Sequence, residues 1–206
     1  MIPYGVDTRV FRPRDKKEAR QLLGLPEDAH VIAFRASLFY RNFKGSEFIE
    51  AALKTYEPQR PTVLLIFEGD YGMEELQDKY QLHFFGWVID SEKIALGLQA
   101  ADIFLMPSIA EAFGLMAIES MACGTPAIIF DGTALPDTIG GPGCGMIVPQ
   151  GDAAAFAKAI KDCLADPDRL DYYRRNGLQH VALKHNFEDY ANRYLRLYQK
   201  LARERT

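Results

Sequence analysis

Two glutamates, Glu111 and Glu119, flank a stretch of seven residues that are all apolar or small. Such a stretch is typical of a buried helix, and we expect a helix over residues 112–122. A carboxylate at either end of a buried segment is costly unless it has a polar partner. Eight helical residues span about 12 Å, which would let one carboxylate hold a sugar and the other a ribose across a diphosphate. Gly114 would let the backbone approach that group closely, and the helix N-terminus would favour its negative charge.

Elsewhere in the chain, short apolar runs alternate with longer segments of helical pattern. The runs predict strands over residues 31–34, 62–67, 82–85, 102–106, 126–130 and 146–148. The longer segments predict helices over 16–23, 46–55, 73–79, 92–100, 112–122, 152–164, 168–180 and 187–203. A strand followed by a helix, repeated about six times, implies right-handed crossovers and a parallel sheet. We therefore expect a Rossmann-like, doubly wound α/β domain of about six strands, with ligands bound where the strands end.

The composition is that of an ordinary globular protein and excludes several classes. Of 206 residues, 48% are hydrophobic and 25% are charged, and the net charge is −4. The basic residues do not form a stripe of the kind that binds a nucleic acid, and no apolar run is long enough to span a membrane. The three cysteines lack metal-ligand spacing, and their odd number argues against a disulfide framework. A reducing, cytoplasmic compartment is the expectation.

The segment around the two glutamates resembles a known family signature. Residues 107–126 read Pro-Ser-Ile-Ala-Glu-Ala-Phe-Gly-Leu-Met-Ala-Ile-Glu-Ser-Met-Ala-Cys-Gly-Thr-Pro. Glu-x7-Glu within this block is similar to the signature of the retaining GT-B glycosyltransferases of family 4, also called group 1. Ile-Pro-Tyr-Gly-Val-Asp at residues 2–7 and Phe-Arg-Pro at 11–13 resemble the segment that joins the two domains of that family. Together the matches cover nearly the whole chain.

The resemblance implies roles for the residues of this block. It implies that Glu111 contacts hydroxyls of the transferred sugar and that Glu119 accepts hydrogen bonds from the ribose hydroxyls. Backbone N–H groups near Phe113, Gly114 and Leu115 are implied to meet the sugar and the diphosphate.

The family also places an arginine and a lysine on the diphosphate, in a Gly-Arg…Lys-Gly pattern after the first strand. Arg35 and Lys44 match this pattern, although a phenylalanine stands where the glycine is usual. Because the intervening loop looks longer than is typical, Arg41 is an alternative to Arg35. Arg35, Lys44 and Glu111 are the expected catalytic residues, since two cations would stabilise charge that develops on a leaving diphosphate. The simpler alternative is that Arg35 only pairs with Glu68 across strand ends.

Two further turns resemble parts of the family's donor site. Trp87 and Val88 follow the third predicted strand and resemble the turn that contacts the base. Gly69 lies where the family often has Gly-x-Gly, and its backbone is expected to line the donor cleft. Trp87 could equally be a packing residue.

The resemblance implies a domain organisation as well. Residues 1–15 are the interdomain segment, 16–186 the donor nucleotide-sugar-binding domain in the C-terminal half of a GT-B fold, and 187–206 a C-terminal helix. The resemblance implies that the family's N-terminal acceptor domain is not part of this chain. The isolated chain is therefore expected to be inactive in transfer, with membrane association only through that other half. Five residues of the last helix recur at helical spacing, and packing on this domain is favoured over packing toward the missing domain: Tyr190, Tyr194, Leu197, Tyr198 and Leu201.

The implied function is a hexosyltransferase that moves a sugar from a UDP- or GDP-linked donor to an acceptor with retention at the anomeric carbon. No cofactor is expected, because the nucleotide diphosphate sugar is the donor substrate. No metal is expected either, since the one Asp-x-Asp lies between two predicted helices and not at a strand end. One alternative is a non-catalytic module that binds a nucleotide sugar. Another is a GT-B-like sugar-nucleotide epimerase, which needs a histidine at a strand end that is not evident. No Gly-x-Gly-x-x-Gly follows the first strand, which disfavours a dinucleotide oxidoreductase.

Overall fold

A six-stranded parallel sheet forms the centre of the computed structural model, which describes residues 2–35, 41–68 and 73–204, except the side chains of residues 41, 42 and 74. Its strands are β1 (His30–Arg35), β2 (Thr62–Phe67), β3 (Gln81–Gly86), β4 (Ile103–Met106), β5 (Ala127–Phe130) and β6 (Met146–Val148). They lie in the order β3-β2-β1-β4-β5-β6, and every neighbouring pair is parallel. The predicted Rossmann-like, doubly wound α/β fold is thereby confirmed, with the strand order reversing between β1 and β4.

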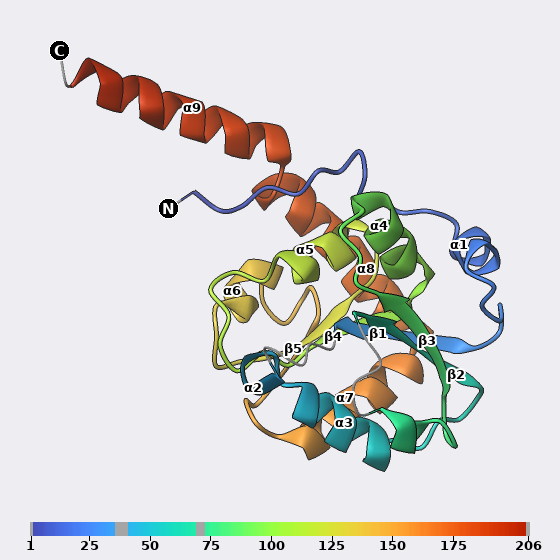
Figure 1. Cartoon of the computed structure of the whole chain (residues 1–206). Helices are drawn as coiled ribbons and strands as arrows, with labels where there is room; N and C mark the ends of the chain where they lie inside the picture. Colours follow the sequence, from blue (N-terminus) through green and yellow to red (C-terminus); the bar gives the residue numbers. More distant parts are fainter. Residues whose placement is uncertain (1, 36–40, 69–72, 205–206) are drawn as a thin grey trace.

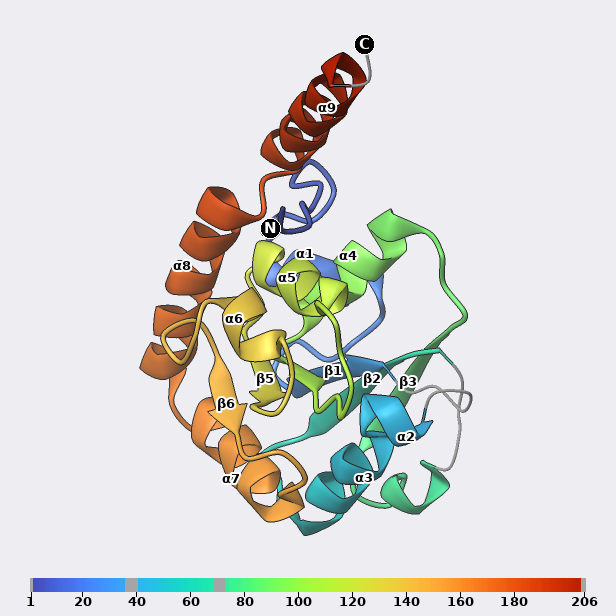
Figure 2. The same cartoon turned by 90° about the vertical axis from the view of Figure 1, so that its left-hand side faces the viewer.

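Helices cover both faces of this sheet (Figure 1). One face carries α1 (Lys16–Leu22), α4 (Ser91–Ala100), α5 (Leu115–Ala122) and α6 (Leu135–Ile139). The other carries α3 (Ser46–Thr55) and α7 (Ala153–Leu164), with the short α2 (Arg41–Lys44) before α3 and a 3-10 helix, η1 (Glu74–Leu76). The long α8 (Pro167–Lys184) packs against both α7 and α5 and so closes the β6 side of the sheet (Figure 2).

The apolar runs of the sequence become strands. The central strands are buried on both faces, whereas β3, at one edge of the sheet, is only partly buried. In β1, Val31 and Ala33 pack under α1, α4 and α5, whereas Ile32 and Phe34 pack against α3 and α7. All six residues of β2 are buried. A strand covered by helices on both sides needs apolar residues at consecutive positions, which explains why these segments show no polar alternation.

The helix predicted over residues 112–122 is wrong at its start. α5 begins at Leu115, after Gly114 in the left-handed conformation with φ of 92°, so Glu111 lies in the loop before the helix. Leu115 is 45% exposed, so this segment is not buried all round. The reason is that the apolar side chains at the start of α5 line a pocket rather than the core. The estimate of about 12 Å for a continuous helix between the two glutamates therefore does not apply.

Three smaller helical features also differ from the predictions. The helix expected over 73–79 is only the 3-10 turn η1, and the short α2 and α6 were not predicted. Each is five residues or fewer, which is too short for the spacing of apolar residues to reveal.

The last helix, α9 (Phe187–Arg203), projects away from the sheet and its flanking helices (Figure 1). Asn186 caps it by accepting hydrogen bonds from the N–H groups of Glu188 and Asp189. None of its residues is buried, and Leu195, Tyr198 and several neighbours are exposed. The favoured prediction, that its apolar side packs on this domain, is therefore wrong for Leu197, Tyr198 and Leu201, whereas the ring of Tyr190 does stack on that of Tyr4. Across residues 2–35, 41–68 and 73–204, helices long and apolar enough to cross a membrane are absent.

Candidate functional site

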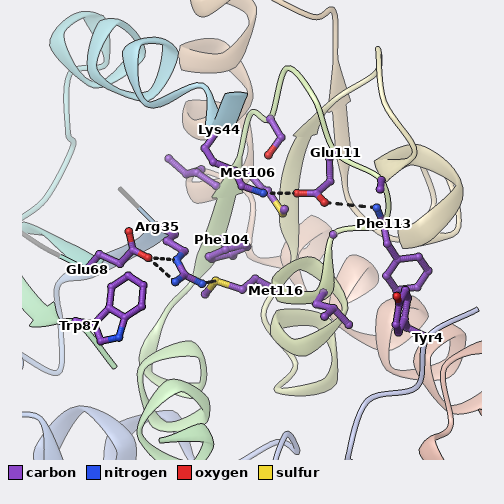
Figure 3. A pocket seen from close by; sticks show the side chains of 15 residues that line it. Tyr4, Arg35, Lys44, Glu68, Trp87, Phe104, Met106, Glu111, Phe113 and Met116 are labelled. Carbon is purple, nitrogen blue, oxygen red and sulfur yellow. Dashed lines mark hydrogen bonds and ion pairs between the residues drawn. The ribbon is translucent and has the colours of Figure 1, made fainter. Parts of the chain in front are cut away.

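A pocket of about 480 Å³ opens at the carboxyl ends of the strands, where the strand order reverses. In open α/β sheets this crevice is the usual ligand site. Strand ends supply Arg35, Glu68, Trp87 and Met106 to its wall (Figure 3). The remaining lining comes from β4 itself, from the segment after it up to the start of α5, from α2 and from the start of the chain: Tyr4, Lys44, Phe104, Leu105, Ser108, Glu111, Ala112, Phe113, Gly114, Leu115 and Met116.

On one side of the pocket, Lys44 and Glu111 form an ion pair (Figure 3). The Lys44 Nζ lies 2.7 Å from the Glu111 Oε2, and the side chain of Glu111 is only 13% exposed. Gly45 follows with φ of 69°, and a Cβ built on it would lie 1.9 Å from the carbonyl oxygen of Pro107. Only glycine permits this approach of α2 to the end of β4, and the approach brings the lysine to the glutamate.

The loop before α5 and the first residues of that helix line the pocket. Gly114 takes up the left-handed conformation at the helix N-cap, and no side chain caps the helix there. The N–H groups in the first turn of a helix have no acceptor within the helix, and they favour an anion. The Glu111 Oε1 accepts a weak hydrogen bond of 3.4 Å from the Phe113 N–H. The Glu111 carboxylate thus lies between a lysine and this helix start.

On the other side of the pocket, Arg35 forms an ion pair with Glu68. The Arg35 Nε donates to the Glu68 Oε1 at 2.6 Å, and the Nη2 contacts the same oxygen. Arg35 ends β1 and Glu68 follows β2, and the parallel register brings these two ends together. The guanidinium carbon lies 5.8 Å from the centre of the Trp87 ring, and Trp87 is 73% exposed. Trp87 therefore stands at the mouth of the pocket rather than in the core.

Glu119 lies one turn further along α5 and is not part of the pocket wall. Burial raises its pKa to about 7, and the positive charge of Arg35 offsets part of that rise. No hydrogen bond to its carboxylate is found from the described residues. A carboxyl group with a pKa near 7 changes its charge within the physiological range, so it can act as an acceptor whose strength depends on pH.

The start of the chain reaches the pocket through Tyr4. The Tyr4 ring contacts that of Phe113, with centroids 5.0 Å apart, while the Tyr4 carbonyl lies 2.9 Å from the Nδ1 of His185. His185 is only 3% exposed, and its own carbonyl accepts a hydrogen bond of 2.8 Å from the N–H of Val6. This joint ties residues 4–6 to the end of α8 and to the loop that carries Glu111.

Most of the residues singled out in the sequence lie at this one pocket. Seven of them line it: Arg35, Lys44, Trp87, Glu111, Phe113, Gly114 and Leu115. Glu119 and Val88 do not line it, Gly69 lies outside the described residues, and the side chain of Arg41 is not described. The lining residues Tyr4, Ser108 and Met116 were missed, and the Oγ of Ser108 is buried with no partner among the described residues. No charge pattern marks these three in the sequence. The described residues also contain no group of three or more histidine, cysteine or carboxylate side chains placed to hold a metal ion.

Comparison with known proteins shows the family of this chain. The family model described as "Glycosyl transferases group 1" matches residues 15–180. The chain belongs to this family. A D-inositol 3-phosphate glycosyltransferase from Catenulispora acidiphila is 32% identical over 194 residues, which are 86% of this chain and 45% of that protein. The group 1 chain spans about half the length of the curated relatives that it matches.

Solved structures of glycosyltransferases share the fold of this group 1 chain. Sucrose-phosphate synthase from Thermosynechococcus elongatus superposes with a TM-score of 0.85 at 33% identity, over 98% of this chain and 52% of that chain. The C-terminal domain of a group 1 glycosyl transferase (LpcC) from Francisella tularensis gives 0.69 at 26% identity, over 88% of this chain and 99% of that domain. HepE from Anabaena, in complex with UDP-glucose, gives 0.78 at 19% identity over 95% of this chain and 56% of HepE, a likeness of fold alone.

Proposed function

We propose that this chain is the donor-binding domain of a retaining glycosyltransferase and that its pocket holds a nucleoside diphosphate sugar. The observation that carries the proposal is the pocket at the reversal of strand order, where Arg35, Lys44 and the uncapped N-terminus of α5 all favour a diphosphate. Support comes from the match to a C-terminal glycosyl transferase domain and from the UDP-glucose bound in HepE. The donor is UDP- or GDP-linked in this proposal.

The chemistry follows from where the charges lie. As the bond from the sugar to the diphosphate breaks, negative charge grows on the leaving phosphate oxygens. Arg35 and Lys44, on the two sides of the pocket, would stabilise that charge, and preorganised cations are effective because they need not reorient during the reaction. Glu111, beside Lys44 and the start of α5, would accept hydrogen bonds from the hydroxyls of the transferred sugar. Retention at the anomeric carbon is part of the proposal and is supported by the family resemblance of the Glu-x7-Glu block.

Transfer would also require a second, acceptor-binding domain. We assign residues 1–15 to the interdomain segment, 16–186 to the donor domain and 187–206 to a helix that packs against the acceptor domain. The apolar side chains of Leu195, Leu197 and Leu201 on α9 support this assignment, because they are exposed, and an exposed apolar surface is typical of an interface. The isolated chain should then bind the donor without transferring its sugar.

The proposal is tested by titrating the chain with UDP, GDP and ADP and with the matching nucleosides. Trp87 is the only tryptophan of the sequence and stands at the mouth of the pocket, so its fluorescence reports binding there directly. We expect at least one diphosphate to change the emission and to bind about 10-fold or more tightly than its nucleoside, because the nucleoside lacks the charges that Arg35 and Lys44 contact. A folded chain that binds none of the three would refute the proposal.

Binding of that diphosphate should strengthen as the pH rises through 7. The assigned role of Glu119 is to accept hydrogen bonds from the ribose hydroxyls, and the ionised carboxylate is the stronger acceptor. With a pKa of about 7, its carboxyl group is ionised in roughly one tenth of molecules at pH 6 and nine tenths at pH 8. Affinity should therefore rise roughly 10-fold over that interval, with a proton released on binding.

Glu119→Gln is the matched control for this pH dependence. The ligand's phosphate also titrates near pH 6, so wild type and variant should share that contribution and differ only in the part due to Glu119. Calorimetry in buffers of different ionisation enthalpy measures the proton release. Identical pH profiles for wild type and Glu119→Gln would contradict the ribose role.

The same carboxyl group sets a pH dependence of stability. Its pKa in the folded chain lies above that of an unfolded glutamate, so the protonated form favours folding. This contribution is fully present below about pH 4.5 and is lost as the pH rises through about 7. Donor binding is therefore expected to favour the ionised form of Glu119, whereas folding favours the protonated form.

A further inference from the structure

Glu68 is a buried carboxylate that the chemistry proposed above does not use. It follows β2 and is only 6% exposed, and its one ionic partner among the described residues is Arg35. The pair occupies the Nε and Nη2 edge of the guanidinium. The remaining nitrogen of Arg35, Nη1, points across the pocket and lies 3.8 Å from the sulfur of Met116, a weak acceptor (Figure 3).

The backbone at Glu68 is strained. Its φ is 83°, and among the described residues it is the one position other than glycine with a positive φ. Its N–H donates a hydrogen bond of 2.9 Å to the carbonyl of Gly86, next to a shift in the register of β2 and β3. A glycine would adopt this conformation without strain. A strained residue persists when its surroundings require it, and such positions gather at functional sites.

Arg35 is thus held on two sides, while its third edge meets only the weak acceptor of Met116. Glu68 fixes one edge, the Trp87 ring lies 5.8 Å from the guanidinium carbon, and the Nη1 edge faces the pocket. A half-exposed arginine without these contacts would sample many rotamers and would lose that freedom on binding an anion. Fixing it beforehand lowers the cost of binding.

We propose that Glu68 is a positioning residue that aims the Nη1 edge of Arg35 at the diphosphate of the donor. The proposal rests on the proposed function, since it needs a diphosphate in the pocket. This positioning role and simple charge repulsion predict opposite changes in diphosphate affinity when Glu68 is replaced. If Glu68 only added negative charge to the pocket, its removal would tighten the binding of an anion. If it positions Arg35, its removal weakens that binding.

The test compares wild type with Glu68→Gln and Glu68→Gly. Each protein is titrated with UDP, GDP and ADP and with uridine, guanosine and adenosine, and binding is followed by Trp87 fluorescence and by calorimetry. For the diphosphate that wild type binds, both variants should bind about 10-fold more weakly, whereas the affinity for its nucleoside should stay within about twofold. Glu68→Gly should melt at the same temperature as wild type or higher, because glycine relieves the positive φ.

Two further proteins serve as controls. Glu57→Gln removes a carboxylate that pairs with Lys79 at 2.8 Å on the surface, and it should leave all affinities unchanged. In an Arg35→Ala background, Glu68→Gln should cause no further loss of diphosphate affinity, because no guanidinium remains to be positioned.

The outcomes are distinguishable. Wild type that binds no diphosphate refutes the proposed function together with this inference. Wild type that binds a diphosphate, with both Glu68 variants binding it equally well or more tightly, overturns the inference alone. An equal loss of diphosphate and nucleoside affinity would mean that Glu68 merely maintains the shape of the pocket, and it would overturn the inference as well. If Glu68→Gln fails to fold, the glycine variant still decides the question.

Discussion

Substitution of Lys44 by alanine should weaken binding of the nucleoside diphosphate by about 30-fold, or ~2 kcal/mol. The variant loses one of the two cations at the pocket that contact the phosphates in our proposal. It also leaves the Glu111 carboxylate, now paired at 2.7 Å and only 13% exposed, without its lysine. An unpaired carboxylate beside the phosphates repels them, which adds to the loss. Titration of wild type and Lys44→Ala with UDP, GDP and ADP measures the change.

Two companion variants separate these contributions. Lys158→Ala removes an exposed lysine that pairs with Asp162 on α7, and it should not change the affinity. The double variant Lys44→Ala/Glu111→Ala should bind the diphosphate more tightly than Lys44→Ala, because it removes the unpaired carboxylate as well. A Lys44→Ala variant that binds the diphosphate as tightly as wild type would rule out contact between Lys44 and the phosphates.

Gly45→Ala should produce the largest loss of stability, roughly 3 kcal/mol. The added methyl group would lie 1.9 Å from the backbone carbonyl oxygen of Pro107, in a conformation with φ of 69°. Because the obstacle is backbone, relief requires α2 to move away from the end of β4. That movement separates Lys44 from Glu111, so the variant should also lose most of its diphosphate affinity. Denaturant unfolding measures the first effect and nucleotide titration the second.

Gly24→Ala is the matched control for this substitution. Gly24 has a similar φ of 65°, but a Cβ built there meets nothing within 4 Å. It should therefore show only the cost of the left-handed conformation, about 1 kcal/mol, and no change in nucleotide binding. Equal destabilisation by Gly24→Ala and Gly45→Ala would show that the contact with Pro107 is not what constrains this turn.

Much of this fold can be predicted from the sequence because the central strands are buried on both faces. Runs such as Thr62–Phe67 have no polar alternation, and each predicted strand lies within one or two residues of the observed one. The start of α5 could not be predicted in this way, because the apolar residues before Leu115 continue the pattern of the helix although they line a pocket. The exposure of α9 could not be predicted either, since an apolar helix face looks the same whether it packs on its own domain or on another.

In the candidate site, too, some features could be predicted from the sequence and others could not. Arg35, Lys44 and Glu111 were singled out because the segments that carry them resemble a family signature, and all three line one pocket. The pairing of Arg35 with Glu68 was only an alternative, because it depends on the register of β1 and β2 and on a positive φ at Glu68. Tyr4 lies about 100 residues from the loop it contacts, and its place depends on the hydrogen bonds around His185. Local sequence patterns do not predict contacts between residues that lie so far apart in the chain.

The joint between Tyr4, Val6 and His185 has a mechanical consequence for the pocket. α9 begins next to His185 and its 17 residues reach about 25 Å, so a tilt of about 10° at the joint displaces its far end by about 4 Å. The Tyr4 ring, which contacts Phe113 and so the loop of Glu111, lies close to the pivot and moves far less. In such a tilt α9 would act as a lever whose short arm lies at the loop that carries Glu111. A large movement at the far end of α9 would therefore produce only a small displacement of the loop that carries Glu111.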